Sequence, residues 1–169
     1  LLPALNHSLV ALKIGPAMHF ALVKPRLLVV DFLAFGFMRF HNNKLYTSNA
    51  AITVKNNTGC VQVFDGTDWS IYETDLRARL GHPLFQIFSL DIDPNDDEHV
   101  YAGGQTGLLE FRDGKFVKEY SNDNGSPLQT AATVGNNNKE YVIVSSLRYG
   151  ADSHLWCFNS IAPSRSLLE

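Results

Sequence analysis

Two stretches decide the fold: Gly59-Cys60-Val61-Gln62-Val63-Phe64-Asp65-Gly66 and, 48 positions further on, Gly107-Leu108-Leu109-Glu110-Phe111-Arg112-Asp113-Gly114. Each starts with glycine, carries apolar residues at alternating positions and ends in Asp-Gly. Alternation with a period of two predicts a β-strand, and Asp-Gly between such runs is a strong hairpin signal. The stretches therefore predict two equivalent hairpins, in which Val61 matches Leu109 and Val63 matches Phe111.

A second repeat has a spacing of 55 positions and joins Lys44-Leu45-Tyr46, His99-Val100-Tyr101 and His154-Leu155-Trp156. Each copy follows a polar turn and presents an apolar residue followed by an aromatic one. Four short strands every 40 to 50 residues, roughly, are typical of one blade of a β-propeller. The repeats thus predict blades of four antiparallel strands.

Clusters of Asn, Asp and Gly divide the chain into short runs rich in β-branched and aromatic residues, as expected for strands joined by turns. We expect strands at about 27–33, 44–48, 60–64, 69–73, 87–92, 99–103, 108–112, 115–120, 141–147, 154–158 and 164–168, and no helical period after residue 30. The fold class is all-β, a propeller fragment of about two and a half blades. An apolar, partly irregular segment, 1–26, precedes the blades 27–73, 86–120 and a partial 141–169. The alternatives are a β-sandwich or an open meander.

Composition excludes some classes of protein. The chain has 169 residues, 45% hydrophobic and 18% charged, with a net charge of −3. This argues against disorder and against a nucleic-acid partner, which attracts a strongly basic surface. Charged residues interrupt the apolar N-terminal region, so we expect no transmembrane segment in this chain. Cys60 and Cys157 are either two buried small side chains or one long-range disulfide.

The run from Ile92 to Gly104, followed by Gly107 to Phe116, resembles the two-component-regulator propeller repeat of Bacteroidetes. His154-Leu155-Trp156 stands where such repeats carry Leu-Trp. Departures are Phe35-Gly36-Phe37-Met38, in place of a Trp strand, and Ala102-Gly103-Gly104, in place of hydrophobic-Gly-Thr. The resemblance implies a periplasmic or cell-surface, non-enzymatic sensor module of a bacterial two-component regulator that binds an oligosaccharide or a protein partner. Neighbouring blades or domains of the parent chain would be further partners.

A narrower resemblance is to the PorZ-like surface propeller family of the type IX secretion system. It is carried by Ala17-Met18-His19, by the run from Leu22 to Asp31 and by Asn124-Gly125-Ser126-Pro127-Leu128. It implies a surface component that docks lipopolysaccharide and partner proteins. A propeller hydrolase or lyase is a third, less favoured interpretation.

Motifs for chemistry are weak. Asp91, Asp93, Asn95 and Asp97 alternate as in a calcium loop, but a glycine and a glutamate are missing at the required positions, so a turn is the better interpretation. Nothing in the sequence selects a catalytic carboxylate pair, and we expect no enzyme activity, cofactor or metal. Trp69, Tyr101 and Trp156 are expected to pack between blades. The ligand-binding candidates are the loop residues His82, Gln105, Arg148 and Tyr149, because propeller ligands usually sit on loops around the central channel.

Overall fold

A computed structural model of the chain describes residues 11–13, 19–21, 35–49, 61–82, 84, 86–131 and 141–160. Short strands and one helical turn make up its secondary structure. Along the chain the elements are β1 Ala11–Lys13, β2 His19–Ala21, β3 Phe35–His41, β4 Lys44–Asn49, β5 Val61–Phe64, β6 Trp69–Tyr72, α1 Leu76–Leu80, β7 Ile87–Asp93, β8 Asp96–Gly104, β9 Leu108–Arg112, β10 Lys115–Tyr120, β11 Ile143–Tyr149 and β12 Leu155–Ser160.

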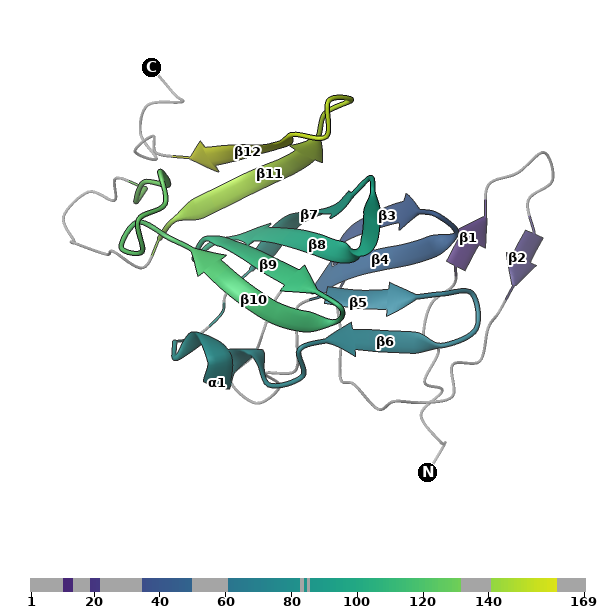
Figure 1. The fold of residues 1–169 in the computed structure, drawn as a ribbon. Coiled ribbons are helices and arrows are strands. Elements are labelled where there is room, and N and C mark those ends of the chain that lie inside the picture. The colour runs from purple at the N-terminus through teal and green to yellow at the C-terminus, as the bar shows by residue number, and fades with distance from the viewer. Residues whose placement is uncertain are drawn as a thin grey trace, which may run out of the picture.

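The strands form antiparallel sheets in chain order. The first sheet is β3-β4-β5-β6, the second is β7-β8-β9-β10, and the third has the two described strands β11 and β12. A small separate pair joins β1 and β2. Figure 1 shows the three sheets one behind another, with β3, β7 and β11 close together. The predicted all-β fold with four-stranded antiparallel sheets is confirmed, and the limits of the blades stay predictions.

Two predictions of secondary structure need correction. The strand that pairs with β4 is β3, which starts at Phe35, whereas the strand expected at 27–33 lies outside the described residues. The helix α1 was not expected, because five residues are too few to show a helical period. It ends at Gly81, whose φ of 73° is the left-handed conformation that often terminates a helix.

The hairpins form at the predicted Asp-Gly turns, but their alignment is shifted by one residue. Val63 pairs with Tyr46, and Glu110 pairs with Tyr101, so Val63 corresponds to Glu110 and not to Phe111. The shift arises at the turns, because four residues separate the paired Phe64 and Trp69 in the first hairpin and two separate the paired Arg112 and Lys115 in the second. Since successive side chains of a strand point to opposite faces, this shift turns Phe111 to the other side of its sheet.

The repeat with a spacing of 55 does hold in three dimensions. Directly opposed residues on antiparallel strands lie on one face. Tyr46 is opposite Arg39, Tyr101 is opposite Asp91, and Trp156 is opposite Arg148. We call the face that bears these aromatic residues the leading face of each sheet, because it is turned toward the sheet that follows in the chain. The opposite face is the trailing face.

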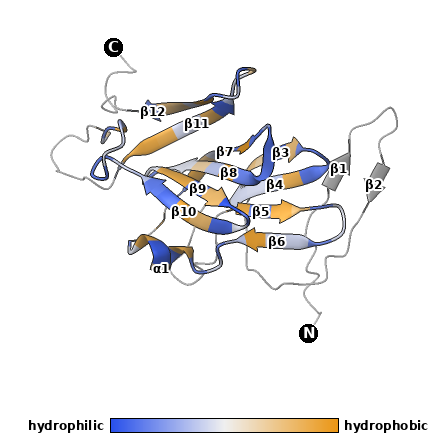
Figure 2. Ribbon diagram, viewed as in Figure 1, coloured by the Kyte–Doolittle hydropathy of each residue, from blue (hydrophilic) through white to orange (hydrophobic). Residues whose placement is uncertain are grey.

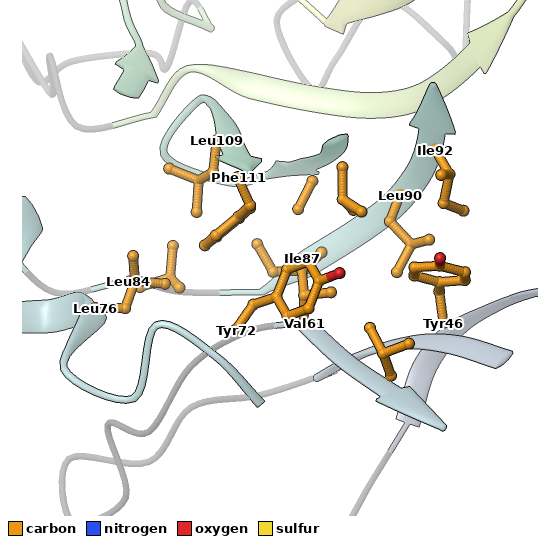
Figure 3. Packing of buried hydrophobic residues seen from close by; sticks show 13 residues of the cluster. Tyr46, Val61, Tyr72, Leu76, Leu84, Ile87, Leu90, Ile92, Leu109 and Phe111 are labelled. Atoms are coloured by element: carbon orange, nitrogen blue, oxygen red, sulfur yellow. The ribbon is translucent and has the colours of Figure 1, made fainter. Parts of the chain in front are cut away.

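The main core lies between the first and second sheets. Tyr46, Val61 and Tyr72 on the leading face of the first sheet meet the trailing face of the second, which contributes Leu90, Ile92, Val100, Leu109 and Phe111. Figure 3 shows the ring of Tyr46 beside Leu90 and Ile92. Most of these side chains are less than 5% exposed. Such burial is worth about 1.5–3 kcal/mol for each large side chain, which explains why the two sheets form one body.

A second core joins the second sheet to the third. Leu108 and Tyr101 pack with Val144 and Leu147 of β11. The strands approach closely at Gly103, where a Cβ atom would lie 2.7 Å from Cγ1 of Val144. In Figure 2 hydrophobic residues follow the strands and hydrophilic residues mark most of the turns. The same joint, leading face on trailing face, is therefore used twice.

Candidate functional site

We call the first strand of each sheet, namely β3, β7 and β11, the innermost strand. One buried carboxylate, that of Asp91, contacts all three innermost strands. Oδ1 of Asp91 lies 3.1 Å from Nε of Arg39, at ion-pair distance but without hydrogen-bond alignment. Oδ2 of Asp91 accepts the backbone N–H of Tyr149 at 2.7 Å. Burial raises the pKa of Asp91, and the N–H groups of Tyr149 and Ile92 counteract that rise. Asp91 thus links all three sheets through the first strand of each.

A group of polar side chains, which we call the clasp, connects the first two sheets near their hairpin turns. It consists of Asn42, Lys44, Tyr72, Asp97 and Glu98. Nζ of Lys44 lies 2.7 Å from Glu98, which also accepts the hydroxyl of Tyr72 at 2.8 Å. Asn42, whose φ is 43°, donates to Asp97 at 2.7 Å. The hydrogen bond from Lys44 lowers the pKa of Glu98 against the opposing effect of its burial. The clasp therefore contains charges that already have partners within the protein.

A second polar cluster is centred on His99, whose side chain is 9% exposed. Its Nε2 lies 2.9 Å from Glu110, and its Nδ1 lies 2.8 Å from Arg112 and 3.3 Å from Asp93. Arginine is always a donor, so we assign Nδ1 as the acceptor and Nε2–H as the donor to Glu110.

Tyr120 completes this cluster by donating to the other oxygen of Glu110 at 2.7 Å. Although burial opposes it, the hydrogen bonds from Tyr120 and His99 hold the pKa of Glu110 below its usual value. The hydrogen bond to Glu110 raises the pKa of Tyr120 to about 12. The cluster resembles a catalytic site in its residue types, but both oxygens of Glu110 have partners within the protein.

The four predicted ligand-binding residues lie in two separate places. Arg148 and Tyr149 end β11, near Asp91. His82 follows α1 with Nε2 2.9 Å from Glu119, and Gln105 lies in the β8–β9 turn, where its N–H donates to the carbonyl of Gln86. These two residues stand at the opposite end of the second sheet, so the structure does not bring the four together.

Arg148 and Tyr149 also differ from each other. Tyr149 lies on the trailing face of its sheet, where its ring centroid is 6.4 Å from that of Tyr101, and burial raises its pKa to about 12. Arg148 is exposed on the leading face, directly opposite Trp156. Tyr149 is therefore part of a joint between sheets, and Arg148 is accessible.

The expectation that three aromatic residues pack between blades holds for Tyr101, which packs against the third sheet. Trp69 lies 5.2 Å from Phe64, centroid to centroid, on the neighbouring strand of its own sheet, and the pairing of Phe64 with Leu45 places both rings on the trailing face. Trp156 is instead 64% exposed, and Phe158 on the same face is 73% exposed. The reason is that no described strand covers the leading face of the third sheet. Among these exposed side chains only Trp156 had been singled out in the sequence, and as a buried one.

Sequence reasoning missed the roles of Arg39, Asp91 and Glu110. Asp91 stood out only as part of a calcium-like alternation, and the structure instead has a β7–β8 turn in which Asp93 accepts the N–H of Asn95 at 2.9 Å. Within the described parts of the chain, no group of three His, Cys, Asp or Glu side chains is arranged to hold a metal ion. Nor does any described helix have the length and hydrophobicity needed to cross a membrane. Cys157 is a free thiol, whereas Cys60 lies outside the described residues.

The chain matches no known protein family and no curated protein. It is similar in structure to PorZ, which is described as an essential bacterial surface component of the type-IX secretion system of Porphyromonas gingivalis from the human oral microbiome. The TM-score is 0.62 at 20% sequence identity, and the match covers 90% of this chain but 20% of PorZ. The chain thus resembles a propeller protein in fold and spans about a fifth of its length. The resemblance to the two-component-regulator repeat stays a prediction.

Proposed function

We propose that this chain is part of a non-enzymatic, extracytoplasmic propeller of a bacterial surface protein, and that it docks partner proteins through its loops. The observation that carries the proposal is the fold, because three sheets joined in series match a known surface component of a secretion system over 90% of the chain. A similar fold does not by itself establish a similar function, so the chemistry of the side chains must also agree with the proposal.

The polar clusters support a scaffold role better than a catalytic one. A general base needs a carboxylate or imidazole that can reach a substrate proton. Asp91 accepts hydrogen bonds from two backbone N–H groups, and Glu110 is bonded to His99 and Tyr120. In this proposal these groups hold the sheets in place, and the exposed loops make the contacts with partners.

Two turns of the second sheet are the candidate contact sites for a partner protein. The β8–β9 turn with Gln105 lies at one end of the second sheet, and the β7–β8 turn with Asn95 lies at the other. Asn95 contacts Ser153 of the β11–β12 turn at 3.1 Å, so two turns form one polar surface there. A partner protein could use either end, and the two positions can be probed separately.

The test is cross-linking in the parent bacterium. A photoreactive amino acid replaces Gln105 in one strain and Asn95 in another, and cross-linked proteins are identified by mass spectrometry. Exposed Val117 on the outer strand β10 is the matched control position. We expect a specific envelope protein to be captured from Gln105 or Asn95 and not from Val117.

Three results would count against the proposal. Capture of the same proteins from all three positions would mean non-specific contact. Tight oligosaccharide binding without any cross-linked protein would favour the sensor function. Turnover of a glycan that is lost in Glu110→Gln would favour a propeller hydrolase or lyase.

A further inference from the structure

His99 lies between two groups that make opposite demands on one of its ring nitrogens. Its Nδ1 lies 2.8 Å from Nη2 of Arg112 and 3.3 Å from Oδ2 of Asp93. A guanidinium only donates hydrogen bonds, and a carboxylate only accepts them. Because Nδ1 carries either a lone pair or a proton, it can satisfy only one of these neighbours at a time. The arrangement therefore contains two alternative sets of hydrogen bonds.

The imidazole ring of His99 is held in place on its other side. Nε2–H donates to Glu110 at 2.9 Å, and this bond is compatible with both the neutral and the protonated ring. The ring centroid of His99 lies 4.8 Å from that of Tyr101, and its side chain is 9% exposed. A change of protonation should therefore leave the ring where it is and change only the partner of Nδ1.

Arg112 and Asp93 are each placed to take part in such a change. Nη1 of Arg112 lies 3.2 Å from Oδ2 of Asp96, and its side chain is half exposed, so Arg112 can leave His99 and still have a partner. Asp93 uses Oδ1 to accept the N–H of Asn95 at 2.9 Å, whereas Oδ2 is the oxygen that faces His99. Both residues thus have a stable arrangement in either state.

The other titratable groups around His99 do not compete with it for a proton near neutral pH. Burial raises the pKa of Tyr101 and of Tyr149, which reaches about 12, and the hydrogen bond to Glu110 raises that of Tyr120. Hydrogen bonds keep the pKa of Glu110 low although burial opposes them. Histidine is the side chain that normally changes charge near neutral pH. The charged and titratable groups that face His99 are Asp93 from β7, Asp96 and Tyr101 from β8, Glu110 and Arg112 from β9, Lys118 and Tyr120 from β10 and Tyr149 from β11.

We infer that His99 is a pH-dependent switch in the second sheet. In the neutral state, Nδ1 accepts a hydrogen bond from Arg112. When Nδ1 takes up a proton from the solvent, the new N–H donates to Asp93, and the guanidinium of Arg112 is displaced toward Asp96 and the solvent. The step forms one N–H bond, and no other covalent bond changes.

The switch should affect two turns in opposite ways. Protonated His99 would hold Asp93, and Asp93 holds the β7–β8 turn through the N–H of Asn95. The side chain of Asn95 contacts Ser153 of the β11–β12 turn at 3.1 Å, so a fall in pH should stabilise this pair of turns. Arg112 would at the same time be released at the start of the β9–β10 turn. The inference goes beyond the proposed docking function and does not depend on it, because the switch is a property of the folded chain.

The test is an NMR titration of the whole chain between about pH 8 and about pH 5, where histidine changes charge. It follows the ring nitrogens of His99 and the solvent exchange of the guanidinium protons of Arg112, with the exposed Arg77 as the reference. At high pH we expect Nδ1 of His99 to carry no proton. As His99 becomes protonated, the exchange rate of Arg112 relative to Arg77 should rise about tenfold with the same midpoint, because a hydrogen bond to a charged group contributes at least that factor.

Two variants should move the switch in opposite directions. Asp93→Asn removes the charge that attracts the proton, so the midpoint of the His99 titration should fall by about one pH unit, and the change in Arg112 exchange should move with it. Arg112→Gln removes the charge that repels the proton, so the midpoint should rise by about one pH unit. The matched control is Asp152→Asn, which removes an exposed carboxylate 3.0 Å from another histidine, His154. It should change neither the midpoint of His99 nor the exchange of Arg112.

Several results would overturn the inference. A proton on Nδ1 in the neutral state would mean that Arg112 does not bind there. Exchange of Arg112 that does not follow the titration of His99, or a constant charge on His99 over this range, would mean that the partner of Nδ1 does not change. An equal shift of the midpoint in Asp152→Asn would mean that Asp93 has no particular role. The first two measurements use the unmodified chain, so they do not depend on the folding of a variant.

Discussion

Asp91 is the residue whose loss should loosen all three sheets at once. Its side chain is 6% exposed, and that of Arg39 is 20% exposed. Removing one partner of a fully buried ion pair costs about 3–5 kcal/mol. Arg39 can still reach water, so we expect Asp91→Asn to lower the free energy of unfolding by about 2 kcal/mol, the asparagine carbonyl still accepting the N–H of Tyr149.

Asp91→Ala should be worse, because it also leaves the N–H of Tyr149 without an acceptor. An unsatisfied buried donor costs about 1–3 kcal/mol, which brings the total to about 4 kcal/mol. The assay is urea unfolding at pH 7, followed by circular dichroism. With a slope of about 2 kcal/mol per molar urea, the midpoint should fall by about 1 M for asparagine and about 2 M for alanine.

Asp68→Asn is the control for this series, because Asp68 is exposed in the β5–β6 turn and its hydrogen bonds with Asp65 are made by its backbone: its carbonyl accepts the N–H of Asp65, and its own N–H donates to Oδ1 of Asp65. We expect its free energy of unfolding to stay within about 0.5 kcal/mol of the parent. The reasoning is refuted if Asp91→Asn behaves like this control, or if alanine is no worse than asparagine.

Three further predictions follow from the joints. Gly103→Ala should lower the free energy of unfolding by about 2 kcal/mol in urea unfolding, since its Cβ would lie 2.7 Å from Cγ1 of Val144; an unchanged midpoint would mean that the sheets can separate freely. Folding lowers the pKa of Glu98, so the stabilisation from its ionised form is present above its unfolded pKa and is lost as the pH falls. In Glu98→Gln the urea midpoint should therefore depend less on pH between about pH 5 and 3, and the difference in free energy of unfolding should be no more than about 1 kcal/mol. A double-mutant cycle of Tyr120→Phe and Glu110→Gln should give a coupling energy of about 1 kcal/mol, and additive effects would exclude the hydrogen bond.

The sequence predicted the hairpins well because their signals are local. Asp113 and Gly114 have φ values of 51° and 73°, which Asp and Gly tolerate in tight turns, and the turn forms as expected. The aromatic repeat of Tyr46, Tyr101 and Trp156 was equally reliable, since all three fall on the same face of successive sheets.

The alignment of Val63 with Phe111 was wrong because the two Asp-Gly turns differ in length, which the sequence does not signal locally: four residues separate the paired Phe64 and Trp69, whereas two separate the paired Arg112 and Lys115. A shift of one residue leaves the hydrophobic pattern intact and reverses the face. The candidate site was predicted less well than the fold. His82 and Gln105 are far along the second sheet from Arg148 and Tyr149, and loop composition does not say which end of a sheet a loop occupies.

The sequence by itself determined that this protein consists of short antiparallel strands in repeated units, because alternation, turn residues and repeat spacing are properties of neighbouring residues. Only the tertiary structure decided that Arg39, Asp91 and Tyr149 meet on the innermost strands, and that Trp156 is exposed where Tyr46 and Tyr101 are covered. The physical reason is that burial and charge pairing depend on which sheet lies against which, and that is set by contacts between residues more than fifty positions apart.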